Sequence, residues 1–174
     1  PAARKKASAI FESLPPAGAD AARIAGAVLP FAERLWFCSY VDPGEGKQPQ
    51  PGALYEIDKD AKFVRRAESV PGVFDNRKMV AGLLSIGPHL IADDGTVRTV
   101  AALQGEHVVS SIRHPGAKDK MYFLTIGGRL LEADLKTLAV TPGPDVPKEL
   151  GLAGAGLHFK GGHTSEGRVV VANN

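Results

Sequence analysis

The stretch KMYFLTIGGRLLEAD, residues 120–134, decides the fold class. Residues 120–125 are rich in aromatic and apolar residues that favour β-strands, and residues 130–134 have the same character. Gly127 and Gly128, between them, can supply the positive φ angles that a tight hairpin turn needs. This pattern predicts a β-hairpin, and we expect a further strand at residues 137–140.

Similar strand-turn-strand units recur from residue 34 onward. We expect strands at 35–41, at 53–58 and 62–66 on either side of a turn, at 84–92 and 96–100 around a second turn, and at 108–112 and 168–172. Strand starts lie a few tens of residues apart, comparable with the ~40–50-residue blades of β-propellers. The sequence therefore predicts an all-β fold made of β-propeller blades, with a β-sandwich as the alternative.

The N-terminal segment has a different pattern. Residues 7–14 and 20–29 carry apolar residues at helical spacing and are followed by prolines, which predicts a short helical segment over residues 1–33. Residues 34–174 form the predicted blade region. It contains about three blades, whereas closed propellers have ~4–8, so we expect the N-terminal part of an incomplete propeller.

Composition narrows the classes of function. The formal net charge is only +2, and the basic residues are scattered, so we expect no nucleic-acid partner. No apolar run reaches the ~20 residues of a membrane-spanning helix. The single cysteine, Cys38, excludes an intrachain disulfide and fits a cytosolic or a periplasmic protein. The chain begins with Pro1 rather than Met, which removal of a signal peptide or a cut within a longer chain would explain.

Several motifs in residues 86–174 carry a family resemblance. They are IGPH (86–89), SIRHP (111–115), KMYF (120–123), LEADLKTL (131–138) and HFKGGH (158–163), the last followed by GRVVVANN (167–174). On these segments the chain resembles bacterial β-propeller proteins of polysaccharide-degrading systems, among which we compare it first with propeller-fold polysaccharide lyases. The resemblance implies an exported, periplasmic or extracellular protein that acts on a polysaccharide or oligosaccharide, although a cytoplasmic location stays open.

Two groups of residues are candidates for chemistry. His158, Lys160 and His163 are expected in a glycine-rich loop, where imidazoles and an ammonium group could bind an anionic sugar or transfer protons. The alternative is a turn whose histidines bond to backbone carbonyls. Arg113 and His114 are expected at a strand end before Pro115, where they could bind a carboxylate and move a proton, unless Arg113 pairs with an acidic neighbour.

Other residues are weaker candidates. His89 could contact substrate, but we favour the interpretation that it is a histidine of the core. Trp36 and Tyr122 are also expected in the core. The spacing of His and Cys residues matches no usual metal site, so we expect neither a metal nor another cofactor.

These observations lead to three functional hypotheses. The first is a lyase acting on a uronic-acid-containing polysaccharide, with Arg113 or Lys160 neutralising the carboxylate and His114 or His158 taking the proton. The second is a non-catalytic propeller that binds glycan or protein. The third is a glycoside hydrolase using carboxylates such as Asp93, Asp94, Glu132 and Asp134. Convergence of the basic residues in one cleft favours an enzyme, and a flat aromatic face favours a binding module.

The final strand carries a separate prediction. Its three consecutive valines at 169–171 predict a buried strand that pairs with an earlier blade or with a second chain, because an unpaired apolar strand would leave backbone groups unsatisfied. The strand from Leu35 is one candidate partner, and a homo-oligomer is the other.

Overall fold

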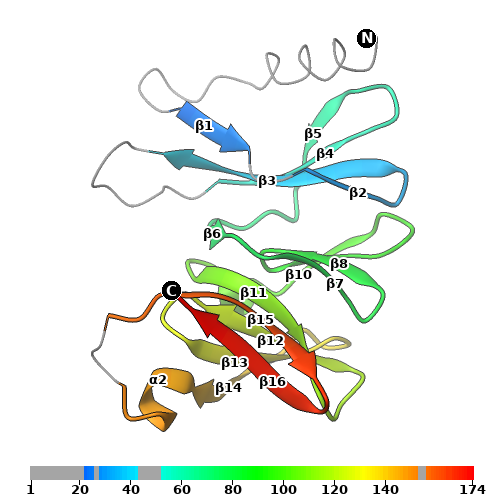
Figure 1. Cartoon of the computed structure of the whole chain (residues 1–174). Helices are drawn as coiled ribbons and strands as arrows, with labels where there is room; N and C mark the ends of the chain where they lie inside the picture. The colour runs from blue at the N-terminus through cyan, green and yellow to red at the C-terminus, as the bar shows by residue number, and fades with distance from the viewer. Residues whose placement is uncertain (1–21, 26–27, 43–51, 153–155) are drawn as a thin grey trace.

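The computed structural model describes residues 22–25, 28–42, 52–152 and 156–174, of which 22–25 and 40–42 are described by their backbone alone. The all-β prediction is confirmed, since strands dominate these residues (Figure 1). Four separate sheets are present there, rather than the two of a β-sandwich. The helical elements described are the single turns η1 (Ala101–Leu103) and α2 (Val146–Glu149).

Three of the four sheets in the described residues are each built from one consecutive run of strands, and the third also includes a short strand that precedes the second sheet in the chain. The first contains β1 (Ala22–Ala25), β2 (Leu29–Phe31), β3 (Arg34–Asp42), β4 (Leu54–Ile57) and β5 (Phe63–Arg65), and the second contains β7 (Arg77–Val80), β8 (Leu83–Ile86), β9 (His89–Ile91) and β10 (Val97–Thr99). The third contains β6 (Val73–Phe74), β11 (His107–Arg113), β12 (Lys120–Thr125), β13 (Arg129–Asp134) and β14 (Val140–Asp145). The fourth is the hairpin of β15 (Phe159–Ser165) and β16 (Arg168–Asn173).

Neighbouring strands are mostly antiparallel and follow chain order. In the second sheet the order is β10-β9-β8-β7, and in the third β11 to β14 follow one another, with β6 added parallel to β11. In the first sheet β1 and β2 pair with successive parts of β3, so together they occupy the position of one interrupted strand. Each sheet is therefore built around an antiparallel meander in chain order.

Three sheets use the same tight turn after their first strand. Ala32-Glu33, Ala81-Gly82 and Glu166-Gly167 join β2 to β3, β7 to β8 and β15 to β16, and both residues of each pair have positive φ. Two positive φ angles are typical of type I′ turns, whose twist matches that of the flanking strands. The third sheet instead has a longer loop, residues 114–119, between β11 and β12.

The sheets stack face to face (Figure 1). The largest hydrophobic cluster joins the first three sheets, and a second cluster joins the third sheet to the β15–β16 hairpin. Phe123 and Leu124 are adjacent in β12 and both fully buried, but they belong to these two different clusters. The strand period of two places their side chains on opposite faces of the third sheet, so both faces are covered.

The helical prediction for the N-terminal segment is wrong where the structure describes it. Residues 22–25 and 29–31 are strands that pair with β3, because this long strand, rich in aromatic residues, offers backbone partners to both segments. Residues 7–14 lie outside the described ranges. The β2–β3 hairpin also joins residues on both sides of the expected domain boundary at 33/34.

Three strand predictions also need correction. The single strand expected at 84–92 is two strands, β8 and β9, because Gly87 has a φ of 57° and starts a reversal with Pro88. The strand expected at 137–140 begins only at Val140. Residues 159–165, expected to be a loop, form β15, which pairs with β16 along its length.

The prediction that the final strand is paired is confirmed, although its partner within the described residues is not the strand from Leu35. β16 pairs with β15, the segment directly before it. The strand is not deeply buried either, since Val170 is 45% exposed while Val169 and Val171 pack against the second cluster.

Candidate functional site

Basic side chains from three sheets converge on one pocket. This basic pocket has a volume of about 390 Å³ and lies where β7, β11 and β15 end. Its lining residues are Lys78, Met79, Val80, Arg113, His114, Pro115, His163 and Thr164. None of these lining residues, all from the described part of the chain, is acidic, so the pocket is suited to an anion.

Contacts between strands hold the pocket together. The Lys78 ammonium donates a hydrogen bond to the Gly162 carbonyl oxygen at 3.2 Å, which links β7 to β15. The Ser110 hydroxyl donates to the same carbonyl and accepts from the Gly162 N–H, both at 3.1 Å, which links β11 to β15. The Thr164 hydroxyl donates to the Arg113 carbonyl oxygen. Strands of three successive sheets therefore form one framework.

Arg113 and His163 have uncommitted side chains in this pocket. Both are exposed, and within the described ranges neither side chain has a hydrogen-bond or ion-pair partner. Arg113 is the last residue of β11, so its expected position at a strand end is confirmed. The pairing with an acidic neighbour that would explain Arg113 structurally is not found among the described residues.

His114 is held more tightly than a catalytic base would be. Its Nδ1 atom accepts hydrogen bonds from the backbone N–H groups of Gly116 at 3.0 Å and Ala117 at 2.8 Å. Its Nε2 atom lies 3.3 Å from a carboxylate oxygen of Glu132, and its ring stacks on Tyr122. An imidazole that accepts at Nδ1 carries its proton on Nε2, so both nitrogens are occupied. His114 therefore stabilises the 114–119 loop beside the basic pocket.

The carboxylate of Glu132, which lies beside His114, also pairs with a second residue. Lys120 pairs with it at 2.5 Å, and this hydrogen bond lowers the pKa of Glu132. Burial, and then the charge of Glu132, raise the pKa of Tyr122. Glu132 thus supports the loop rather than serving as a free acid.

His158 and Lys160 lie apart from the basic pocket. His158 directly precedes β15, and its carbonyl oxygen accepts from the Asn174 N–H at 3.0 Å. Lys160 is near the start of β15, and its positive charge is one cause of the lowered pKa of Asp75. Of the sequence-predicted residues, the pocket therefore brings together Arg113, His114 and His163 only.

His89 is a core residue. Its side chain is fully buried, its Nδ1 atom lies 3.0 Å from the Thr99 hydroxyl, and its ring meets Phe74 edge to face. Burial lowers its pKa from 6.5 to about 4. A ligand cannot reach this ring in the folded protein, which agrees with the structural interpretation of His89 and not with a substrate contact.

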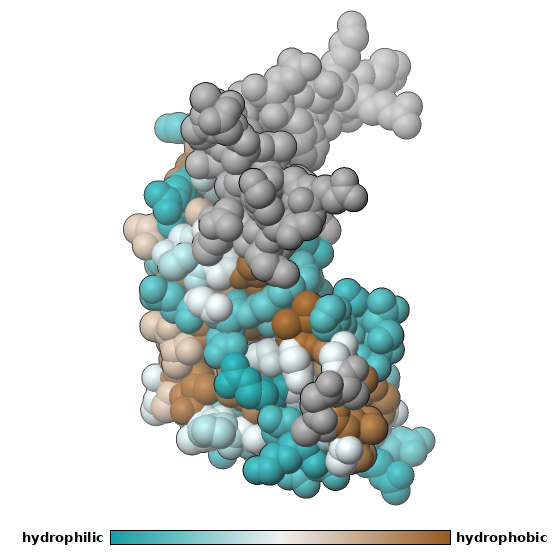
Figure 2. Space-filling model, turned by 90° about the vertical axis from the view of Figure 1, so that its left-hand side faces the viewer, coloured by the Kyte–Doolittle hydropathy of each residue, from teal (hydrophilic) through white to brown (hydrophobic). Residues whose placement is uncertain are grey.

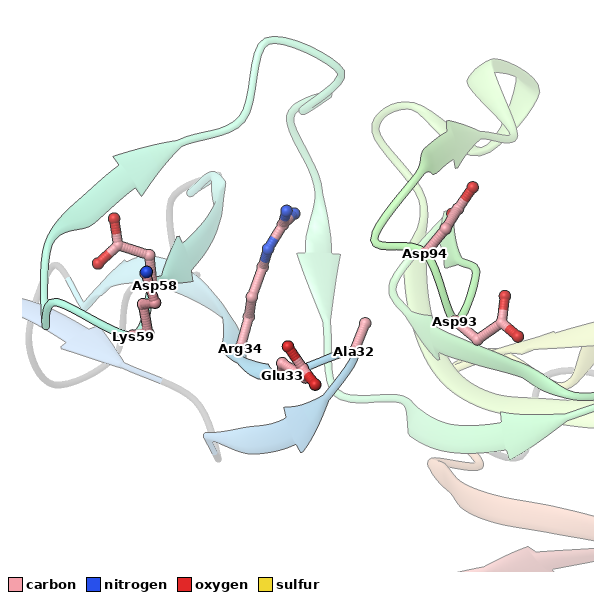
Figure 3. A pocket seen from close by; sticks show the side chains of 7 residues that line it. All are labelled: Ala32, Glu33, Arg34, Asp58, Lys59, Asp93 and Asp94. Carbon is pink, nitrogen blue, oxygen red and sulfur yellow. The ribbon is translucent and has the colours of Figure 1, made fainter.

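A second pocket, of about 480 Å³, lies between turns of the first and second sheets (Figure 3). Asp58 and Lys59 face Asp93 and Asp94 across it, with Arg34 between them. The carboxylates of Asp58 and Asp94 accept backbone hydrogen bonds in their own turns, so they stabilise local structure. Asp134 has the same role, and it accepts from the backbone of Lys136 and Thr137.

Aromatic platforms for sugar rings are not found among the described residues. The large hydrophobic side chains exposed there are Leu35, Met79, Leu150, Leu152 and Val170, and none is aromatic. Trp36 is fully buried, as expected, with its indole N–H donating to the Phe31 carbonyl oxygen at 2.9 Å. Tyr122 is only partly buried.

Among the charged side chains that line the basic pocket, Lys78 is the one that the sequence did not predict. It belongs to β7, a strand that the sequence pattern did not predict, and nothing near it in the sequence marks it as a ligand-binding residue. Only the pairing of β7 with β8 and the approach of β7 to β15 bring it to the pocket.

Within the described ranges, no helix is long and apolar enough to cross a membrane, and no group of three or more His, Cys, Asp or Glu side chains could hold a metal ion. No protein-family model matches the chain, and comparisons with curated proteins and with solved structures gave no match.

Proposed function

We propose that the chain forms consecutive blades of a β-propeller and binds an acidic polysaccharide through the basic pocket. The arrangement of strands supports the blade interpretation, because β7, β11 and β15, each opening the meander of its own sheet, approach one another across three successive sheets. Face-to-face stacking of such meanders around an axis, first strands innermost, is the architecture of propeller blades.

One observation carries the ligand assignment: the uncommitted Arg113 and His163 share a pocket with Lys78 and with no acidic lining residue. An arginine can hold a carboxylate through two parallel hydrogen bonds, and a lysine adds a point charge. Met79 and Pro115 add apolar surface beside these cations. The ligand class that suits this combination is a uronate-containing glycan, as the family resemblance implies.

Binding measurements test this proposal. We expect the protein to bind polygalacturonate or alginate and to leave the neutral polymer dextran unbound, with an affinity that falls as salt is added. Arg113→Ala should weaken binding about tenfold, because a charge-assisted contact is lost. Arg65, an exposed arginine of β5 outside the pocket, provides the control variant Arg65→Ala. Equal binding of dextran, or unchanged affinity in Arg113→Ala, would contradict the proposal.

A lyase reaction is the second candidate, and the pairing of a free cation with a free imidazole favours it. Arg113 would neutralise the uronate carboxylate, which acidifies the neighbouring C–H, and His163 would take that proton. The electron pair of the broken C–H bond then forms a C=C bond as the C–O bond to the adjoining sugar breaks, and the leaving oxygen takes a proton from water. His163 replaces His114 and His158 in this role. The Nδ1 atom of His114 already accepts two backbone N–H groups and its Nε2 atom faces Glu132, and His158 lies outside the pocket. The same incubations test it: a lyase produces ultraviolet absorbance from unsaturated uronates. His163→Ala should lose this signal even with enough polymer to saturate its weakened binding, whereas Arg65→Ala should keep it.

A further inference from the structure

A carboxylate–imidazole pair lies at the opposite end of β11 from the basic pocket. His107 is the first residue of β11, and its Nε2 atom lies 2.8 Å from a carboxylate oxygen of Asp75. The Asp75 backbone N–H donates to the Val108 carbonyl oxygen at 2.9 Å, which holds the backbone of Asp75 beside β11. The side chains remain reachable, with 25% of His107 and 51% of Asp75 exposed.

The hydrogen bond determines which nitrogen of His107 is available. An ionised carboxylate can only accept, so the proton must be on Nε2. The bond from His107, and then the charges of His107, Arg77 and Lys160, lower the pKa of Asp75 and keep it ionised. The Nδ1 atom of neutral His107 therefore carries a lone pair, and no described residue bonds to it. This is the reverse of His114, whose Nδ1 is occupied by two backbone N–H groups.

Two cations accompany the pair. Lys160 is exposed and has no ion-pair partner among the described residues. Two backbone hydrogen bonds, both of 2.9 Å, hold its strand near His107. The Phe159 N–H donates to the Ile126 carbonyl oxygen, and the Ile126 N–H donates to the His107 carbonyl oxygen. Arg77 begins the neighbouring strand, and its shielded Nε atom has no partner in the described structure. Figure 2 views the molecule from the side where β6 and the C-terminus lie in Figure 1, and hydrophilic residues cover much of that face.

We propose that Asp75 and His107 form a general-base dyad that hydrolyses carboxylic esters bearing a negative charge, with Lys160 and Arg77 recognising that charge. His107 Nδ1 takes a proton from a water molecule as the water oxygen bonds to the ester carbonyl carbon. The bond from that carbon to the leaving oxygen then breaks, and the proton passes from Nδ1 to the leaving oxygen. Asp75 keeps the Nε2 proton in place throughout and stabilises the transient imidazolium.

This site is separate from the basic pocket. Six residue steps of β11, about 20 Å, separate His107 from Arg113. Its activity does not depend on binding of an acidic glycan by Arg113 and His163, so each site can fail its test without the other.

A matched pair of aryl acetates tests the dyad. The probes are p-nitrophenyl acetate, which is neutral, and acetoxynitrobenzoate, which carries a carboxylate. We expect faster hydrolysis of the anionic ester, and a loss of at least about tenfold of the catalysed rate in His107→Ala and in Asp75→Asn. Lys160→Ala should lower the rate on the anionic ester roughly threefold more than on the neutral one. His158→Ala, at an exposed histidine outside the site, should leave both rates unchanged.

A second measurement decides the matter even if His107→Ala fails to fold. Diethyl pyrocarbonate acylates an uncommitted imidazole nitrogen, and peptide mass spectrometry locates the modified histidines. We expect His107 to react faster than the exposed His158, and Asp75→Asn to remove this advantage. Ester hydrolysis in folded His107→Ala within about twofold of the unaltered protein, or acylation of His107 no faster than that of His158, would overturn the dyad.

Discussion

His89 shows how a single buried residue can make the stability of this protein depend on pH. The Thr99 hydroxyl donates to the Glu68 carbonyl oxygen at 2.7 Å, so it accepts from His89, whose proton is then on Nδ1. The Nε2 atom is buried, and the described structure contains no partner for it. Protonation would place a charge there without a bonding partner, and burial accordingly lowers the pKa of His89 to about 4.

Acid should therefore destabilise the fold through His89. Its pKa is about 6.5 in the unfolded chain and about 4 in the folded one, so the unfolded state binds the proton first as the pH falls. Stability should be lost between these two values, by about 3 kcal/mol in all. Urea unfolding at pH 7.5 and pH 4.5 measures this loss, and His89→Gln should show a smaller one. A His158→Gln control should behave like the unaltered protein, and equal losses in all three would rule out His89 as the cause.

Residue-scale inference from the sequence succeeded where chemistry is local. Arg113 before His114-Pro115 was expected at a strand end and is found there, uncommitted. The roles of the histidines could not be predicted in the same way, because they depend on distant partners. The backbone N–H groups of residues 116 and 117 donate to Nδ1 of His114, and Glu132 lies beside its Nε2. In His107, by contrast, Asp75 contacts Nε2 and leaves Nδ1 without a described partner.

At the scale of elements, the packing of the β15–β16 hairpin on β11 depends on Gly162. A Cβ atom at this position would lie 2.5 Å from the Ile112 side chain and 3.0 Å from the Val170 carbonyl oxygen. Gly161, beside it, has nothing within 4 Å of such an atom. The two neighbouring glycines therefore differ sharply in how much space surrounds them.

We predict that Gly162→Ala destabilises the protein by about 1–3 kcal/mol, because the added methyl group forces the hairpin away from the third sheet. Gly161→Ala is the matched control and should change the free energy of unfolding by less than about 0.5 kcal/mol. Denaturant unfolding gives the free energies, and hydrogen exchange of the β16 amides reports the loosened hairpin. Equal effects of the two variants would refute the tight contact at Gly162.

The elements that the sequence failed to predict share one property: pairing with other strands stabilises them more than their own local propensity does. β15 contains two adjacent glycines, yet it is a strand because β16 pairs with it and Ser110 bonds to both polar backbone groups of Gly162. Residues 22–25 have a helical pattern but pair with β3. By contrast, the hairpin at 120–134 has strong propensity and turn chemistry, and its prediction is confirmed.

At the scale of the whole molecule, the stack of sheets contains two hydrophobic clusters that can be tested separately. Phe123 belongs to the cluster that also contains Trp36, the single tryptophan, whereas Leu124 belongs to the cluster beneath the hairpin. Stacked units that contact only their neighbours need not all lose structure together.

We predict that Phe123→Ala lowers the denaturant midpoint of the Trp36 fluorescence transition, with a loss of about 3–5 kcal/mol from the cavity. Leu124→Ala removes a comparable contact on the other face and should mainly increase hydrogen exchange in β15 and β16, with a smaller shift of the Trp36 transition. Val170→Ala, at an exposed position of β16, serves as the control. Identical shifts of the Trp36 transition in the two core variants would mean that the stack unfolds as one unit.

The positions of the hairpin tips have a consequence for how such a protein can acquire new specificity. The turns after the first strands of the sheets, including the longer 114–119 loop, emerge on the right-hand side of Figure 1. Lengthening one of these tips adds side chains to a common surface without altering the strands that hold the layers together. Natural variation or a combinatorial library confined to residues 32–33, 81–82, 114–119 and 166–167 would thus diversify recognition while the scaffold is inherited unchanged.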